Sequence, residues 1–125
     1  MTRVLVIEDE TDIRNLLSDM LREAGCEVDL APNGTVALGK MHKHLPDVVV
    51  LDLMMPVMDG WGFIETLRTQ TKWSQVPILV VSATHELPKT AERLGVMAAI
   101  TKPFDLDHLV SEVERLAALH YADRH

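Results

Sequence analysis

The chain has 125 residues and a formal net charge of −7, from 12 basic and 19 acidic side chains, so we expect one acidic domain over residues 1–125 with no direct contact to nucleic acid. Its single cysteine, Cys26, excludes an internal disulfide, and we interpret it as a small buried hydrophobe. Because the sequence has no signal peptide and no apolar run near the roughly 20 residues of a membrane span, we expect a cytoplasmic protein without membrane contact.

The first half of the chain alternates short apolar runs with amphipathic stretches. Residues 3–7 are a predicted strand, and the apolar side chains that follow recur at helical spacing up to Gly25, which suits a left-handed helix cap. This predicted stripe consists of Ile13, Leu16, Leu17, Met20 and Leu21. A weaker strand at 26–31 precedes a second helix, for which Asn33 is the predicted N-cap.

The middle of the chain contains its most apolar run. Residues 48–51 lack polar alternation, which favours a central strand covered on both faces, and Asp52 follows directly. A third helix is expected from Gly60 to about residue 71. Its buried side is predicted to consist of Phe63, Ile64 and Leu67. A fourth strand at 76–81 and a helix at 85–94 complete this part.

The last two elements are a strand at 96–100 and a helix capped by Asp105. The apolar stripe of this helix is predicted to consist of Leu106, Leu109, Val110, Val113 and Leu116. Five strands thus alternate with five helices, which predicts right-handed crossovers and a parallel sheet. We therefore expect an α/β fold: a doubly wound five-stranded parallel sheet of order 2-1-3-4-5, the flavodoxin-like (βα)5 arrangement, rather than a closed barrel of eight units.

Acidic residues stand where two predicted strands end: Glu8 and Asp9 after the first, Asp52 after the third. In the expected order these strands are neighbours, and a crevice opens at their carboxyl ends. Two carboxylates ~4 Å apart repel by about 4 kcal/mol at an effective dielectric of ~20, so converging acids require protonation or a cation. Magnesium fits so small a cluster, because it takes oxygen ligands, keeps several waters and works with one or two carboxylates plus phosphate oxygens.

Two further polar residues follow the neighbouring strands, Ser82 after the fourth and Lys102 after the fifth. A carboxylate nucleophile, a divalent cation, a hydroxyl and a lysine can together receive a phosphoryl group, because that transfer depends on positioning and charge neutralisation. The expected product is an aspartyl phosphate. Each part also has an ordinary interpretation: residues 8–10 as a solvated acidic helix start, and Lys102 as a surface lysine.

These motifs, in this order and over essentially the whole chain, resemble the receiver domains of response regulators in two-component signalling. By this resemblance Asp52 would be the phosphoacceptor, and Glu8 and Asp9 would position Mg²⁺ directly or through water. The backbone carbonyl of Met54 would be a further metal ligand. Many receivers have aspartate where this chain has Glu8, and we expect metal binding to survive that exchange.

The resemblance also implies roles for the other strand ends and for partners. Ser82 would hydrogen-bond the phosphoryl group, Lys102 would form an ion pair with it, and Lys102-Pro103 would correspond to the family's cis peptide. The implied phosphodonor is a histidine kinase or histidine phosphotransfer protein, with small acyl phosphates as substitutes. The implied receiver of the signal is a downstream protein target or an effector domain that this chain lacks.

The sequence departs from the family at two points. Ala99 stands where receivers commonly carry an aromatic residue whose rotation accompanies activation, so that switch cannot operate in its usual form. Met54 and Thr84 flank the expected site, and neither offers a carboxylate or an amide to orient attacking water. We therefore predict self-dephosphorylation over minutes or more, and we keep a constitutive docking receiver as an alternative.

Two other functions have less support. An aspartate-nucleophile phosphatase typically has a second aspartate two residues after the nucleophile, where this chain has Met54. A flavin-binding domain of the same topology needs hydroxyls and glycines in the first loop, where residues 8–10 are all acidic. The histidines show no ligand spacing, and we interpret all six as surface residues. They are His42, His44, His85, His108, His120 and His125.

Overall fold

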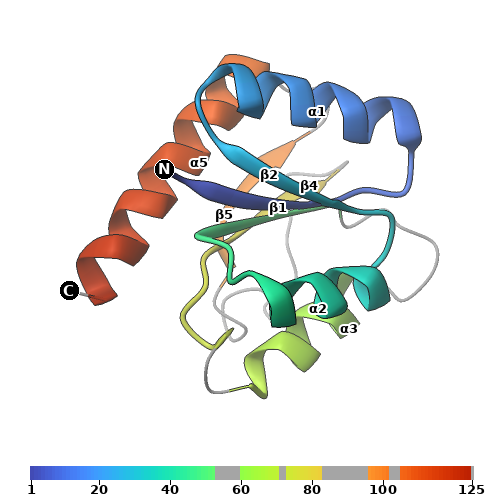
Figure 1. Cartoon of the computed structure of the whole chain (residues 1–125), viewed down its shortest axis with the longest axis vertical. Coiled ribbons are helices and arrows are strands. Elements are labelled where there is room, and N and C mark those ends of the chain that lie inside the picture. Colours follow the sequence, from blue (N-terminus) through green and yellow to red (C-terminus); the bar gives the residue numbers. More distant parts are fainter. Residues whose placement is uncertain (53–59, 71–72, 83–95, 102–104, 125) are drawn as a thin grey trace.

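The computed structural model describes residues 1–52, 60–70, 73–82, 96–101 and 105–124. Its strands are β1 (Arg3–Ile7), β2 (Glu27–Ala31), β3 (Val48–Asp52), β4 (Ile78–Ser82) and β5 (Val96–Thr101). All neighbouring strands run parallel, in the order β2-β1-β3-β4-β5 (Figure 1). The predicted fold class and strand order are therefore confirmed.

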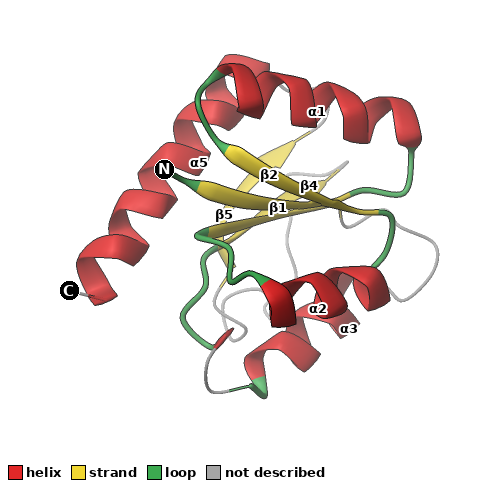
Figure 2. Cartoon of the chain, in the orientation of Figure 1, coloured by secondary structure: helices red, strands yellow, loops and turns green. Residues whose placement is uncertain are grey.

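Helices cover both faces of this sheet. Those within the described ranges are α1 (Thr11–Glu23), α2 (Gly34–Lys43), α3 (Gly60–Arg68) and α5 (Leu106–Arg124). Figure 2 shows α1 and α5 on one face of the sheet and α2 and α3 on the other. The helix predicted at 85–94 lies outside the described residues. None of the helices described is both long and apolar enough to cross a membrane.

Local signals in the sequence explain how two of these helices end and begin. Gly25 adopts a φ of 95°, a conformation that favours glycine, and its amide donates to the carbonyl of Arg22 as the chain leaves α1. Asn33 is the N-cap of α2, as predicted, and its side chain accepts a hydrogen bond from the amide of Val36 at 2.9 Å.

The core is divided by the sheet into two apolar layers. Every residue of β3 is buried, which explains why its sequence lacks polar alternation. Side chains of β1 and β3 alternate between the layers: Leu5 and Val49 pack toward α2 and α3, whereas Val4 and Val48 pack toward α1 and α5. Burying each such side chain stabilises the folded state by about 1.5–3 kcal/mol. The stable sheet in turn fixes the positions of the residues that follow its strands.

Three side chains lie elsewhere than the sequence pattern predicts. In α1, Leu16 is 48% exposed whereas Ser18 is buried, because the helix turns Leu17 and Leu21 toward the sheet. His120 is also buried, at 4% exposed, so its interpretation as a surface residue was wrong. It lies seven residues after Val113 and four after Leu116, and this helical spacing continues the buried stripe of α5.

The segment between α3 and β4 is held by one arginine. Nη1 of Arg68 donates to the carbonyls of Trp73, Ser74 and Val76, at 3.3, 3.0 and 2.9 Å. Trp73 is 2% exposed, and no sequence pattern predicted its burial. β4 begins at residue 78 rather than 76, because the amide of Val76 donates to the carbonyl of Trp73 in a turn and not to a strand.

Candidate functional site

The register of the two central strands brings two acids together. Ile7 of β1 pairs with Leu51 of β3, so the residues that follow them, Glu8 and Asp52, leave neighbouring strands side by side. The amide of Glu8 also donates to the carbonyl of Ala31 at 3.1 Å, which extends the contact of β1 with β2 beyond the assigned strand. The backbone of the sheet therefore fixes where both carboxylates begin.

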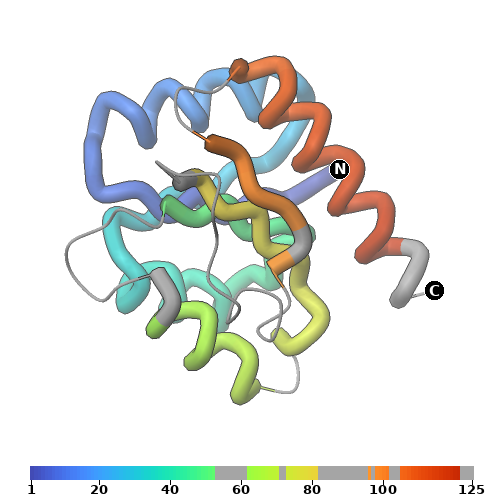
Figure 3. The backbone as a smooth tube through the Cα atoms, turned by 180° about the vertical axis from the view of Figure 1, so that it is seen from behind, coloured from blue at the N-terminus to red at the C-terminus, as the bar shows by residue number. Residues whose placement is uncertain are grey.

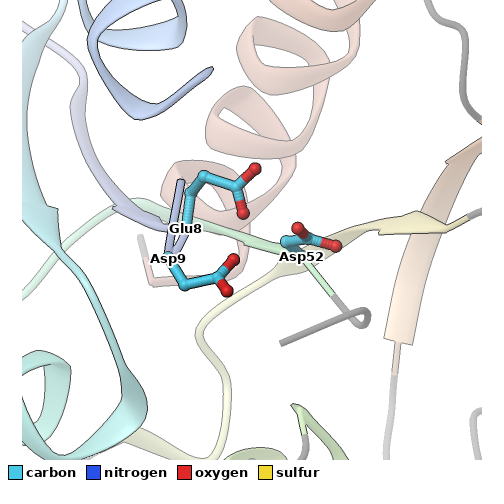
Figure 4. Close-up of side chains that lie close together, drawn as sticks. All are labelled: Glu8, Asp9 and Asp52. Carbon is cyan, nitrogen blue, oxygen red and sulfur yellow. The ribbon is translucent and has the colours of Figure 1, made fainter. Parts of the chain in front are cut away.

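Three carboxylates form one compact cluster. One oxygen each from Glu8, Asp9 and Asp52 lies within 4.8 Å of the others. Figure 4 shows the three groups gathered together, with Glu8 and Asp9 on the loop after β1 and Asp52 at the end of β3. Glu8 is 1% exposed and Asp52 6% exposed, whereas Asp9 is exposed. The cluster thus has two buried acids and one that faces solvent.

The buried pair carries an electrostatic cost. When Glu8 and Asp52 are both ionised, a separation of at most 4.8 Å gives a repulsion of about 3.5 kcal/mol or more at an effective dielectric of about 20. Positive charge near the pair offsets this repulsion and favours the ionised forms. A cation held between the acids supplies such charge, and so does a nearby ammonium group.

The donor set fits magnesium. Mg²⁺ binds oxygens at about 2.0–2.1 Å, so opposite ligands of one ion are about 4.2 Å apart. The limit of 4.8 Å in this cluster slightly exceeds that span, which suits a site where one carboxylate binds through a water. The exposed side of Asp9 leaves room for the waters that Mg²⁺ retains. Calcium takes six to eight oxygens, whereas one oxygen from each acid supplies three, so the small cluster suits Mg²⁺, which keeps several waters, better than calcium.

A small cavity of about 10 Å³, roughly the space of one water, lies beneath the buried pair. Apart from the two acids, its lining is apolar. The lining residues are Ile7, Glu8, Ile13, Leu17, Val50, Asp52 and Val81. Apolar surroundings lower the effective dielectric, so charges at Glu8 and Asp52 interact more strongly than they would in water.

The remaining predicted site residues are only partly described. Ser82 is the last residue of β4 and pairs with Thr101 of β5, while the preceding Val81 pairs with Asp52. The backbone of position 82 therefore lies at the same edge of the sheet as the acidic cluster. Met54 and Lys102 lie outside the described residues, as does the Lys102-Pro103 peptide.

One residue that contacts this site, Arg14, was not predicted from the sequence. Arg14 of α1 donates a hydrogen bond of 2.8 Å from Nη1 to the carbonyl oxygen of Glu8. An arginine on an amphipathic helix is usually a surface residue, and no motif set this one apart. Only the structure reveals this contact, because it depends on how the loop after β1 turns into α1.

The sequence is similar to one protein family along most of its length. The profile of the response regulator receiver domain matches residues 4–114. The chain is 34% identical over 125 residues to response regulator Rre1 of Synechocystis sp., which covers 95% of this chain and 53% of Rre1. It is 35% identical over 118 residues to transcriptional regulatory protein PcoR of Escherichia coli, which covers 93% and 51%. The chain thus spans about half the length of these relatives.

Comparison with solved structures gives a similar result. The chemotaxis protein CheY4 of Vibrio cholerae matches with a TM-score of 0.87 at 33% identity, covering 93% of this chain and 98% of CheY4. A sensor protein from Polaromonas sp. JS666 matches with a TM-score of 0.89 at 30% identity, covering 95% and 98%. Sequence and fold comparisons therefore point to the same family.

Proposed function

Because this chain belongs to the response regulator receiver domains of two-component signalling, we propose that it is a phosphoacceptor switch that takes up a phosphoryl group on Asp52. The observation that carries the proposal is the cluster of Glu8, Asp9 and Asp52, with its oxygens within 4.8 Å of one another at the end of the sheet. As a regulatory domain it assists its own modification and does not process a separate substrate.

In this proposal each acid has a distinct role. A carboxylate oxygen of Asp52 forms a bond to phosphorus while the bond from phosphorus to the donor breaks, at a nitrogen of phosphohistidine or at the oxygen of an acyl phosphate. The donor leaves as a histidine, which takes a proton from solvent, or as a carboxylate. Glu8 and Asp9 would hold Mg²⁺ beside Asp52, and the backbone carbonyl of Met54 would be a further ligand. When bound, Mg²⁺ supplies positive charge for the phosphoryl oxygens.

Ser82 and Lys102 complete the site in this proposal. The position of Ser82 at the end of β4, one residue beyond the partner of Asp52, supports a hydrogen bond from its hydroxyl to a phosphoryl oxygen. Lys102 follows β5 in the sequence, and its ammonium would supply positive charge for the phosphoryl oxygens. The proposed phosphodonors are a histidine kinase or a histidine phosphotransfer protein. The signal passes to an effector domain or to a downstream protein.

One observation favours a second function, a docking receiver whose binding does not depend on phosphorylation. Ala99 lies on β5, the edge strand in Figures 1 and 3, pairs with Val80 and is exposed. A methyl group there cannot rotate between a buried and an exposed position as a large ring can. Hydrogen exchange in β4 and β5, with and without an acyl phosphate, separates the two functions. Unchanged exchange in fully phosphorylated protein favours docking.

Incubation with a small acyl phosphate and Mg²⁺, followed by intact mass measurement, tests the main proposal. The native chain should gain the mass of one phosphoryl group, and Asp52→Asn should not. Asp19→Asn is the matched control, because Asp19 is exposed on α1 and outside the cluster, and it should behave like the native chain. A chelator should prevent the gain. Equal labelling of Asp52→Asn and the native chain would contradict the proposal.

A further inference from the structure

Arg14 connects α1 to the loop that carries two of the acids. Its Nη1 donates to the carbonyl oxygens of Glu8 at 2.8 Å and Asp9 at 3.4 Å, and its Nη2 donates to Oγ1 of Thr11 at 3.4 Å. The side chain is half-buried. One guanidinium therefore binds both carbonyls at the point where the chain turns from β1 into α1.

The backbone of Glu8 is held from two directions. Its amide donates to the carbonyl of Ala31 at 3.1 Å, and its carbonyl accepts from Arg14. Glu10, the N-cap of α1, makes no capping hydrogen bond with its side chain. The guanidinium thus supplies a side-chain link between the start of the helix and the acidic loop that the N-cap does not provide.

The choice of partners matters for a cation site. Among the described residues, Arg14 bonds to carbonyls and a hydroxyl and forms no ion pair with a carboxylate. The carboxylates of Glu8 and Asp9 are therefore not drawn away from Asp52 by this arginine. Its positive charge would by itself disfavour a second cation nearby, since like charges repel.

We propose that Arg14 is a positioning residue for the magnesium site: by fixing the carbonyls of Glu8 and Asp9, it orders their carboxylates around the ion. This inference rests on the proposed function. Groups that orient metal ligands without touching the metal typically change affinity by 10–100-fold when removed. Geometry and charge predict opposite signs for removing Arg14, because lost order weakens Mg²⁺ binding whereas a lost positive charge strengthens it.

Calorimetric titration with Mg²⁺ alone tests the proposal. Arg14→Met should raise the Kd for Mg²⁺ about tenfold, and Arg14→Lys, which keeps the charge without the planar fork, should give an intermediate Kd. Arg22→Met is the matched control: Nη2 of Arg22 also donates to a backbone carbonyl, that of Val28 at 3.2 Å, but at the far end of α1. Its Kd should stay within twofold of the native value.

A second readout separates positioning from a loss of stability. With an acyl phosphate as donor, the Mg²⁺ concentration for half-maximal phosphorylation of Arg14→Met should rise about tenfold, while the rate at saturating Mg²⁺ stays within about twofold. A purely structural role would lower the melting temperature and leave the Kd for Mg²⁺ unchanged.

The possible results distinguish the role of Arg14 from the existence of the metal site. An unchanged or tighter Kd in Arg14→Met, beside a native chain that binds Mg²⁺, would overturn the role of Arg14 and leave the proposed function intact. If Arg14→Met does not fold, Arg14→Lys decides, and a native Kd in that variant would overturn the proposal. A native chain with no affinity for Mg²⁺ would instead contradict the metal site itself.

Discussion

Nη1 of Arg68 donates a hydrogen bond of 2.9 Å to the carbonyl oxygen of Val76, two residues before β4 begins. The same nitrogen also reaches the carbonyls of Trp73 and Ser74, so one charged group holds the whole turn that leads into the strand. Burial lowers the pKa of the Arg68 guanidinium, because the charged form is less well solvated there. Arginine nevertheless stays protonated, and Nη1 of Arg68 donates to all three carbonyls.

Replacing this side chain should therefore destabilise the protein. Arg68→Met leaves three backbone carbonyls without their charged donor, and we expect the free energy of unfolding to fall by about 2–4 kcal/mol in urea denaturation. Arg115→Met is the control: within the described ranges Arg115 pairs with Glu112 alone, and its own side chain is 51% exposed. Its replacement should change stability by less than about 1 kcal/mol. Equal losses in the two variants would show that the carbonyl contacts of Arg68 add little.

Magnesium should stabilise the folded chain against heat. At a concentration ten times its Kd, a ligand that binds only the folded state adds about 1.4 kcal/mol, or about 5 °C in Tm for a domain of this size. Differential scanning calorimetry of Glu8→Gln and Asp52→Asn should show most of this gain lost, because each variant removes a buried carboxyl group of the proposed magnesium site. Asp19→Asn should keep it. A gain of the same size in all four proteins would place the ion elsewhere.

The thiol of Cys26 should make stability depend on pH in alkaline solution. Burial raises the pKa of Cys26, and the negative charge of Glu114 raises it further. The unfolded chain therefore loses this proton at a lower pH than the folded chain does. The contribution is complete below about pH 8.5, the unfolded value, and is lost as pH rises toward the folded pKa.

Urea denaturation of the native chain and of Cys26→Ala at several values from pH 7.5 to 10.5 measures this effect. The free energy of unfolding should fall more steeply with pH in the native chain. The difference in slope should stay below about 1.4 kcal/mol per pH unit, the limit for one proton. Parallel curves would mean that the Cys26 thiol titrates alike in the folded and unfolded chains.

The aspartyl phosphate on Asp52 should be long-lived. Neither Met54 nor Thr84 carries a carboxylate or amide that could orient a water for attack on phosphorus. We expect the purified phosphorylated chain to lose its phosphoryl group over minutes or more. Intact mass measurements at intervals after the donor is removed follow this loss. Decay within seconds would contradict this expectation.

Most of the fold was predictable because its strongest signals are local. The apolar run at 48–51 predicted a central strand, and Asn33 predicted the start of α2, since each signal acts within a few residues. Strand ends were less predictable. Pairing with β4 extends β3 to Asp52, and pairing with β4 also extends β5 to Thr101, so the ends depend on partners distant in sequence.

The errors in side-chain burial have a similar cause. Leu16 satisfies the helical spacing of α1 but is exposed, because the packing of α1 against the sheet selects Leu17 and Leu21. His120 could have been placed correctly from its spacing to Val113 and Leu116 in α5, had its polarity not suggested the surface. Arg14 could not, because its contact with Glu8 depends on the path of the loop.

The proximity of Glu8 and Asp52 was also predicted from the sequence. Chain topology alone placed Glu8 and Asp52 at neighbouring strand ends, and the register of Ile7 with Leu51 confirms that they lie side by side. The depth of burial was not predictable, because it depends on the apolar side chains beneath the two carboxylates.

Identification of the phosphorylated residue tests the central claim most directly. Borohydride reduces an aspartyl phosphate to homoserine, so chain treated with acyl phosphate and Mg²⁺, then reduced and digested, reports the modified position by peptide mass. We predict homoserine at position 52, dependent on Mg²⁺ and absent from Asp52→Asn. Reduction at Glu8 or Asp9, or no reduced residue in a chain that binds Mg²⁺, would contradict the assignment of Asp52 as phosphoacceptor.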